Sequence, residues 1–418
     1  MHYFLYHAGE LYCEEVPVLK IIEKFGTPLY IYSGKTIRRH FRVFDSAFAE
    51  IKHLTCYSVK ANSNLAILAL LGREGAGADI VSGGELYRAL KAGIPPHKIV
   101  FSGVGKTEEE IELALRAGIL MFNVESLEEL ALLGEIAKKL KIKAPFALRA
   151  NPNVDPKTHP YISTGLRKNK FGIPEEEILS AYIKFSENPY LEPLGLDAHI
   201  GSQLTTLSPF VDAVKRLRML YEDLLSHGFS LKYLDVGGGL GIPYDQEEPP
   251  LPEEYSSALI RELKGLETTL ILEPGRVIVG NAGILVTKVL YTKSNREKNF
   301  VIVDAGMNDF IRPSLYQAYH KIIPVLDRDE GQIVADIVGP VCESGDFFAK
   351  DRKIPRVRRG DYLAIMGAGA YGFVMSSNYN SRPRPPEVLV EGDQIYLIRR
   401  REDIADLVAL EEIPPIYS

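Results

Sequence analysis

The feature that most constrains this chain is an alternation of short apolar runs with longer amphipathic stretches, from about Leu29 to Arg276. The apolar runs are LTCYSV (54–59), ADIV (78–81), IVFS (99–102), ILMFNV (119–124), PFALRA (145–150), LGLDAHI (194–200), YLDVGG (233–238) and TLILE (269–273). Most are separated by helical patterns, such as residues 126–140, where apolar residues recur on one face. Eight strand–helix units in about 250 residues predict an α/β fold, a (β/α)8 TIM-type barrel. A doubly wound open sheet is the alternative, because periodicity does not show closure.

The pattern changes after Asn281, where helical patterns become few. The β-rich runs there are ILVTKVLYT, FVIVDAG, IVADIVGP, DYLAIMG, EVLVEG and QIYLIR. Such runs, separated by turn residues, predict a C-terminal all-β domain over residues 279–418, a Greek-key-like barrel. The strand-like opening YFLYHAGELYCEE predicts that an N-terminal segment, 1–28, completes this domain. The (β/α)8 barrel is then expected over 29–278.

Composition narrows the class of protein. Hydrophobic residues make up 46% and charged residues 25%, which is typical of a soluble globular chain. The net charge of -6 argues against a nucleic-acid partner, and no apolar run approaches the ~20 residues that cross a membrane. Three cysteines, Cys13, Cys56 and Cys342, are too few for a disulfide framework. Together with the absence of a secretory signal, they predict a cytoplasmic protein with reduced thiols.

Unusual residues follow the apolar runs directly. Lys60 follows CYSV, SGGE follows ADIV, RANP follows PFAL, HIGS follows GLDA, GGGLG follows YLDV, and EPGR follows LIL. Each motif alone is more often an ordinary loop. In a barrel, however, all strand ends of this type open on one face, so the six motifs are expected to converge on one pocket.

The glycine run GGGLG (237–241) lets the backbone approach an anion and turn its N–H groups towards it. It lacks the G-x-G-x-x-G spacing of dinucleotide folds, which makes a nicotinamide dehydrogenase the weakest alternative. A compact phosphate fits this loop better than a pyrophosphate.

Two ionisable residues at strand ends indicate the chemistry. Glu273 is as readily a helix cap or an ion-pair partner of Arg276, but it could also keep a pyridine nitrogen protonated. Opposite charges ~4 Å apart at an effective dielectric of ~20 interact by about 4 kcal/mol, roughly three pKa units. A lysine is usually a solvated surface charge. At a strand end beside these candidates, Lys60 is predicted to form a Schiff base, which a desolvated pocket favours.

Together these motifs resemble the fold-type III pyridoxal-phosphate enzymes, with alanine racemase-like barrels, and within them the diaminopimelate decarboxylase family. The similarity runs from FGTPLYIY (25–32) to GAYGFVMSSNYNSRPRPPEVLV (369–390). Its most specific stretches are YSVKANSN, RANPNVDPKTHPYISTGLRKNKFGI, HIGSQ, DVGGGLGIPY, EPGR, RPSLYQAYH and CESGD. No motif position departs from the family pattern.

The resemblance implies pyridoxal 5'-phosphate as the cofactor and no metal. Lys60 would bind it covalently, Glu273 would pair with its ring nitrogen, and His199 would lie against its ring, although a lone histidine is more often structural. The phosphate would be held by Ser202, Gly238, Gly239 and Tyr371. Further cofactor contacts are implied for Asp79, Gly275 and Arg276.

The implied reaction is decarboxylation of meso-2,6-diaminopimelate, a small amino acid, to L-lysine and carbon dioxide, the last step of lysine biosynthesis. The resemblance also implies a homodimer with shared sites. Cys342 and Glu343 would come from the partner subunit, and Cys342 would return a proton to Cα. A buried cysteine is more often an inert small hydrophobe.

The far end of this substrate carries a carboxylate and an ammonium. Because an arginine gives a carboxylate a two-pronged partner, Arg276 and Arg312 are candidates for that carboxylate. Tyr316 and Tyr371 would add hydrogen bonds, and Glu343 would take the ammonium. The ordinary alternative for Arg312 is a surface ion pair, which contributes little.

Other functions remain open. A related decarboxylase of ornithine, arginine or carboxynorspermidine has the same fold, and carbon dioxide release with each substrate separates them. An amino-acid racemase is disfavoured, because those relatives place an arginine at the ring nitrogen and this chain offers Glu273. A non-catalytic pyridoxal-phosphate-binding protein is disfavoured by the long segment beyond Asn281.

Overall fold

The computed structural model describes residues 2–154, 164, 169–328 and 330–417. The chain divides into two compact units. One, the barrel unit, is Arg38–Ile278, and the other, the β unit, combines Met1–Ile37 with Val279–Ser418. The chain therefore begins in the β unit, forms the barrel unit, and returns to the β unit.

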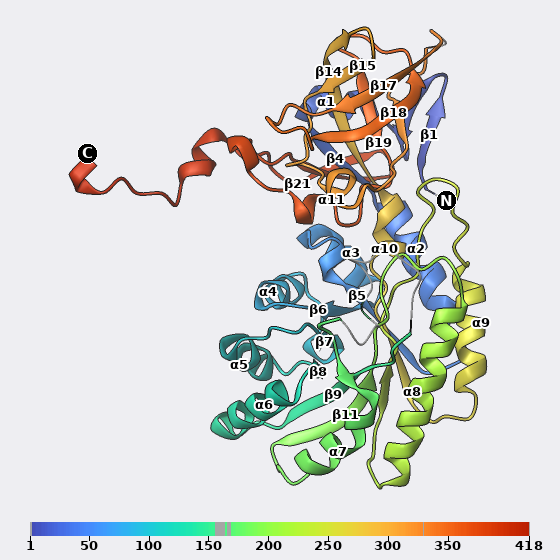
Figure 1. The fold of residues 1–418 in the computed structure, drawn as a ribbon, viewed down its shortest axis with the longest axis vertical. Helices are drawn as coiled ribbons and strands as arrows, with labels where there is room; N and C mark the ends of the chain where they lie inside the picture. The colour runs from blue at the N-terminus through green and yellow to red at the C-terminus, as the bar shows by residue number, and fades with distance from the viewer. Residues whose placement is uncertain (1, 155–163, 165–168, 329, 418) are drawn as a thin grey trace. The chain divides into compact units, whose positions relative to one another are not determined.

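The barrel unit is a closed ring of parallel strands (Figure 1). The strands are β5 (His53–Ser58), β6 (Gly77–Ile80), β7 (Ile99–Phe101), β8 (Met121–Val124), β9 (Ala144–Asn151), β11 (Leu191–Asp197), β12 (Tyr233–Asp235) and β13 (Thr269–Leu272). They pair in chain order, with the short β10 (Ile173–Pro174) beside β9, and β13 pairs with β5 to close the ring. Closure confirms the predicted barrel and excludes the open sheet.

Helices lie outside these strands in Figure 1. They are α3 (Leu65–Arg73), α4 (Gly83–Lys91), α5 (Glu108–Ala117), α6 (Leu127–Leu140), α7 (Glu175–Phe185), α8 (Ser208–Ser226) and α9 (Pro252–Leu263). Helix α2 (Gly34–Ser46) leads into the unit, and the short α10 (Arg276–Val279) follows β13. Local signals start several of them: Ser82, Thr107 and Ser126 cap α4, α5 and α6 by accepting a backbone N–H three residues on. In the described part of the chain, no helix combines the length and apolarity that a bilayer crossing needs.

The β unit is built around one long sheet. Its strands are β4 (Leu29–Ser33), β14 (Gly283–Ser294), β15 (Asn299–Val303), β17 (Gln332–Val338), β18 (Phe347–Pro355), β20 (Glu387–Glu391) and β21 (Gln394–Arg399), with β16 (Ile322–Pro324) and β19 (Tyr362–Ile365) paired beside β14. Their order is β18-β17-β15-β14-β4-β20-β21. The predicted β-rich runs after Asn281 therefore form one sheet.

The N-terminal segment completes the β unit. Strands β1 (Phe4–His7), β2 (Glu10–Cys13) and β3 (Val16–Pro17) form a small antiparallel sheet, followed by helix α1 (Val18–Phe25). Phe4 and Leu11 are buried in one apolar cluster with Ile284 and Val388 of the long sheet. The strand-like opening of the sequence thus packs on the β domain, as predicted.

One boundary differs from the prediction. The barrel was expected to begin at residue 29, but strand β4, Leu29–Ser33, pairs antiparallel with β14 and parallel with β20 in the β unit. All five of its residues are buried, as in the centre of a sheet. A short run that is buried on both faces has the same pattern in a barrel and in a central sheet strand, so periodicity could not separate the two.

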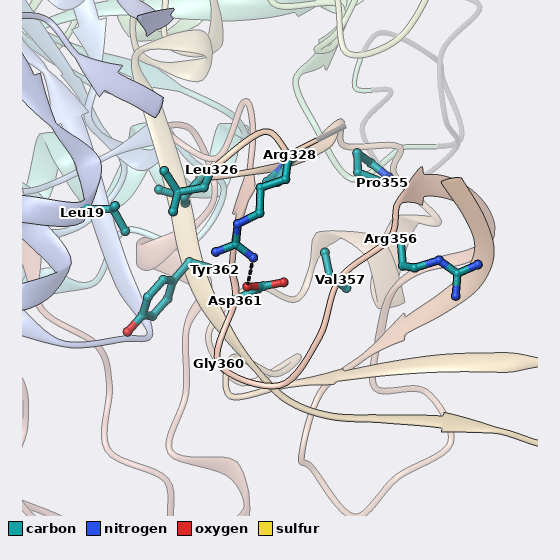
Figure 2. Close-up of a pocket in the computed structure, with 11 residues that line it drawn as sticks. Leu19, Leu326, Arg328, Pro355, Arg356, Val357, Gly360, Asp361 and Tyr362 are labelled. Carbon is teal, nitrogen blue, oxygen red and sulfur yellow. Dashed lines mark hydrogen bonds and ion pairs between the residues drawn. The ribbon is translucent and has the colours of Figure 1, made fainter. Parts of the chain in front are cut away.

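A small pocket of about 80 Å³ lies in the β unit (Figure 2). Leu19, Pro324 and Tyr362 line it, and an ion pair between Arg328 and Asp361, at 2.9 Å, also lies in its wall. The residues that line it, within the described chain, include none of the predicted site residues. Lys60 and Glu273 lie instead directly after the barrel strands β5 and β13.

Candidate active site

Lys60 lies in a short 3-10 turn, Val59–Ala61, immediately after β5. Its Nζ donates a hydrogen bond to Asp79 Oδ2 at 2.7 Å, and the Asp79 side chain is fully buried in β6. Ser58 Oγ lies 2.9 Å from both Asp79 Oδ2 and the main-chain oxygen of Glu273, and its single proton can be donated to either. The ends of β5, β6 and β13 are thereby joined, and two predicted site residues, Lys60 and Asp79, are in contact.

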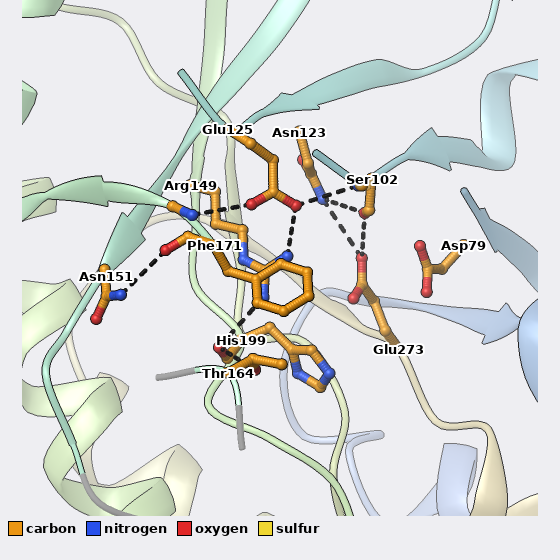
Figure 3. Close-up of polar contacts among 12 residues, drawn as sticks. Asp79, Ser102, Asn123, Glu125, Arg149, Asn151, Thr164, Phe171, His199 and Glu273 are labelled. Atoms are coloured by element: carbon orange, nitrogen blue, oxygen red, sulfur yellow. Dashed lines mark hydrogen bonds and ion pairs between the residues drawn. The ribbon is translucent and has the colours of Figure 1, made fainter. Parts of the chain in front are cut away.

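Glu273 follows β13 and is only 4% exposed (Figure 3). Burial raises the pKa of its carboxyl well above the ordinary value, and the charges of Asp235 and Asp79 raise it further, while Lys60 opposes them. A cationic group placed against Glu273 would favour ionisation, because an opposite charge stabilises the carboxylate. Glu273, the predicted partner of a ring nitrogen, is thus a carboxyl whose ionisation a nearby cation would strongly favour.

The loops HIGS and GGGLG are packed against each other and against Glu273. A Cβ on Gly238 would lie 2.0 Å from the Glu273 main-chain oxygen, and one on Gly239, whose φ is +111°, would lie 2.5 Å from the Gly201 oxygen. The Gly238 N–H donates to His199 Nδ1 at 3.4 Å. Only glycine allows this approach, and it leaves the loop backbone beside His199.

His199 is half-buried in this packing. Burial lowers the pKa of its imidazole well below the ordinary value, and the charges of Arg149 and Lys60 lower it further. The ring is therefore neutral near neutral pH. A neutral imidazole can lie against an aromatic ring without adding a competing charge to the site.

The loop after β13 meets the loop after β11. Arg276, which is 4% exposed, donates from one terminal nitrogen to Ser202 Oγ at 3.0 Å and from the other to Tyr244 OH at 2.7 Å. A Cβ on Gly275 would lie 3.0 Å from the side chains of Ala61 and Ser58, so a larger residue would collide with the Lys60 turn. Ser202 and Arg276 thus provide hydrogen-bond donors at this end of the barrel, and Tyr244 was not predicted.

A buried polar layer inside the strand ends was also missed. Glu125 and Arg149 form an ion pair at 2.6 Å, and Arg149 also donates to the main-chain oxygen of His199 at 3.4 Å (Figure 3). Ser102, Asn123 and Asp235 belong to the same layer, beside Glu273. Ser102, Asn123 and Asp235 could have been found in the sequence, because each is a polar residue within or directly after an apolar run: VFS, FNV and LDV.

Two of the remaining predicted residues form a contact within the β unit. Arg312 is 6% exposed, and its guanidinium carbon lies 5.7 Å from the centre of the Tyr316 ring. Its Nε also donates to His320 Nε2 at 3.4 Å. Arg312 is therefore a buried arginine, and the surface-ion-pair alternative does not apply.

Cys342, Glu343 and Tyr371 also belong to the β unit. Cys342 is exposed, unlike Cys13 and Cys56, and its backbone N–H donates to Asn380 at 2.8 Å. Glu343 accepts a hydrogen bond from Tyr379, which raises the pKa of that phenol. Tyr371 has a left-handed backbone, with φ of +54°. An exposed thiol is open to chemistry that the buried-cysteine alternative excludes.

The barrel residues fit a phosphorylated pyridine aldehyde. Lys60 offers an amine, Glu273 a buried carboxyl, and Ser202, Arg276 and the glycine loop offer donors to an anion. Asp79 Oδ1 is buried and accepts no hydrogen bond from the described residues. Because a buried acceptor is seldom left unsatisfied, this oxygen is consistent with a further group beside Lys60.

Comparison with known proteins agrees with this donor set. Residues 34–280 match the family described as pyridoxal-dependent decarboxylase, pyridoxal binding domain. Diaminopimelate decarboxylase of Aquifex aeolicus is 54% identical over 402 residues, covering 96% of this chain and 95% of that protein. Diaminopimelate decarboxylase of Vibrio cholerae is 52% identical over 417 residues, covering 99% and 100%. The crystal structure of the Helicobacter pylori enzyme with L-lysine has a TM-score of 0.92 at 48% identity, covering 94% of this chain and 99% of that one.

Replacing Gly238 by alanine is expected to weaken binding of pyridoxal phosphate about tenfold or more, because the new Cβ would displace the loop from Glu273 by steric overlap. Titration of the apoprotein, followed by cofactor absorbance, measures this. Gly105→Ala is the matched control, since a Cβ there meets nothing within 4 Å. Equal affinities of Gly238→Ala and the wild type would contradict the role of this loop.

Proposed function

The chain belongs to the family of pyridoxal-dependent decarboxylases, and we propose that it converts meso-2,6-diaminopimelate to L-lysine and carbon dioxide, the last step of lysine biosynthesis. It is a lyase with pyridoxal phosphate as cofactor. Diaminopimelate decarboxylases at about 50% identity over the full length support this substrate, as do relatives solved with L-lysine. The observation that carries the proposal is the hydrogen bond from Lys60 to Asp79, beside the buried carboxyl of Glu273.

The bound cofactor supplies an electron sink for the pair of electrons left when the Cα–carboxylate bond breaks. Lys60 must present a neutral amine to hold it, and Asp79 is placed at 2.7 Å to accept the ammonium proton. Glu273 would hold a proton at the ring nitrogen, and opposite charges ~4 Å apart at an effective dielectric of ~20 interact by about 4 kcal/mol. His199, neutral and half-buried, would pack against the ring.

The phosphate is assigned to donors from three loops. Ser202 would contribute a hydroxyl, and Gly238 and Gly239 would contribute main-chain N–H groups, for which the Gly238 N–H would have to leave His199 Nδ1. Arg276 adds a positive charge, with Gly275 allowing its close approach to the Lys60 turn. Tyr371 of the β unit is assigned a further hydrogen bond to the phosphate.

Substrate choice is assigned mainly to the β unit. Arg312 is proposed to take the distal carboxylate, aided by Tyr316 and Tyr371, with Arg276 as the other candidate. A buried guanidinium supports this role, because it is desolvated and oriented before binding. Glu343 is proposed to take the distal ammonium. Ornithine lacks a distal carboxylate, so a pocket with an arginine is poorly suited to it.

We also propose a homodimer in which Cys342 and Glu343 act in the partner's site, with Cys342 returning a proton to Cα. The exposure of the Cys342 thiol is consistent with that role. A cytoplasmic location is proposed as well, and the three free thiols support it.

Incubation of the protein with meso-diaminopimelate and pyridoxal phosphate is expected to release carbon dioxide and lysine in equal amounts. Lys60→Ala should lower kcat by about a thousandfold or more, since it removes the covalent attachment point. Lys52→Ala, at an exposed lysine just before β5, is the control and should keep full activity. Release of carbon dioxide from ornithine or arginine, and not from diaminopimelate, would replace the substrate proposed here.

Arg312→Lys keeps the charge but loses the two-pronged geometry. The value of kcat/KM for diaminopimelate is expected to fall by about tenfold to hundredfold, the range of a charge-assisted hydrogen bond. Arg359→Lys is the control, because Arg359 is exposed and also lies over a tyrosine ring, Tyr291, at 5.6 Å. An unchanged kcat/KM in Arg312→Lys would remove this residue from the clamp.

Sharing of sites between subunits can be tested with a hybrid dimer. Lys60→Ala and Cys342→Ala chains, co-expressed with different tags and purified through both, leave one site with both native residues. That hybrid is expected to show about half of the wild-type activity, because one of two equivalent sites is complete. A hybrid no more active than either parent variant would show that each site is built within one chain.

A further inference from the structure

Asn123 is a fully buried amide that joins three side chains at the centre of the barrel. Its Nδ2 lies 3.0 Å from Asp235 Oδ2, 3.2 Å from Ser102 Oγ and 3.4 Å from Glu273 Oε1. Ser102 Oγ in turn donates to Glu273 Oε1 at 3.3 Å. Ser102, directly after β7, and Asn123, in β8, thus both hydrogen-bond the carboxyl of Glu273.

Asp235 is the second carboxyl of this group, at the end of β12 and fully buried. One of its oxygens accepts from the Gly237 N–H at 2.9 Å and the other from Asn123 at 3.0 Å. Both oxygens are therefore acceptors, as in an ionised carboxylate. Asn123 Nδ2 also lies 3.4 Å from Glu273 Oε1, so the two carboxyls meet at one amide group. Two buried carboxylates this close would repel each other, so a proton on one of them is favoured. Asp235 has a donor at each oxygen, whereas Ser102 and Asn123 both reach Oε1 of Glu273, so we assign the proton to Glu273.

The surrounding charges favour this proton. Asp79 and Asp197 are the other buried acids whose charges act on Glu273 or Asp235, and Cys56 lies close enough to respond to the pair. Among the cations, Lys60 is paired with Asp79, and Arg149 is paired with Glu125.

Ionisation of every carboxyl would leave like charges close together in a dry interior, which is unfavourable. Burial and Asp197 accordingly raise the pKa of Asp235 to about 7, and burial raises that of Glu273 well above its ordinary value.

We propose that Asp235 is a positioning residue that stores a proton on Glu273, so that the cofactor's ring nitrogen takes its proton from this carboxyl and not from water. The O–H bond of Glu273 breaks, an N–H bond forms at the nitrogen, and the electron pair of the O–H bond stays on Glu273 as a carboxylate. Glu273 thereby changes from a neutral acid to a carboxylate paired with the protonated nitrogen, and no proton is taken up from water at this step. The inference rests on the proposed cofactor.

Calorimetric titration of the apoprotein with pyridoxal phosphate, in two buffers with different heats of ionisation, counts the protons taken up. The pH is set above that at which the ring nitrogen of the free cofactor loses its proton. In Asp235→Asn the new amide donates to Glu273 and makes it a carboxylate before binding, so the nitrogen must take a proton from water. The variant is therefore expected to take up about one proton more than the wild type. Equal proton counts would overturn the proposal.

Asp45→Asn is the matched control. It makes the same chemical change at a carboxylate that hydrogen-bonds Thr55 and His53, at the beginning of β5, and it should leave the proton count unchanged. Failure of the proposed function would look different, because the wild type itself would then give no binding heat with pyridoxal phosphate and no carbon dioxide.

A measurement on the wild type alone covers the case in which Asp235→Asn does not fold. The cofactor analogue with carbon in place of the ring nitrogen cannot accept a proton there. Because Glu273 supplies the proton in the proposal, cofactor and analogue are expected to give the same proton count. An excess of about one proton for the natural cofactor would overturn the proposal, because that proton would then come from water.

Discussion

Pairing of β13 with β5 is the interaction on which the site depends. Lys60 and Glu273 are far apart in the sequence, and this pairing places the ends of their strands side by side. Ser58 N–H donates to the Pro274 oxygen at 3.0 Å, and Ser58 Oγ bonds the Glu273 oxygen, so the two loops are fixed by main-chain as well as side-chain contacts. An open sheet would leave these strands at opposite edges, and the amine and the acid would not meet.

Electrostatics then determine what this barrel end can bind. Buried carboxyls outnumber the buried cations among the residues described at the strand ends, and protonation is the alternative to repulsion. Such a layer favours a ligand that brings a positive charge towards Glu273 and a negative charge towards Ser202 and Arg276. A pyridine ring that can be protonated, with a phosphate at its other side, has that distribution of charge.

The two units carry different parts of the proposed chemistry. In the barrel unit, glycines and short strands bring backbone and polar side chains close together, which suits a bound cofactor. In the β unit, buried Arg312 and exposed Cys342 lie on segments that connect sheet strands, where substrate specificity can vary without disturbing the barrel. Family relatives with other substrates would then be expected to differ mainly in the β unit.

The sequence alone determined the barrel strands, the helices between them and the position of Lys60, Asp79, Glu273 and the glycine loops, because each is a local pattern that follows an apolar run. Only the tertiary structure decided that β4 belongs to the β unit, since a short buried run looks alike in either sheet. It alone also decided that Asn123 and Asp235 face Glu273. The sequence shows that a polar residue inside an apolar run is unusual. It does not show the partner of that residue, because the partner lies on another strand that barrel closure brings close.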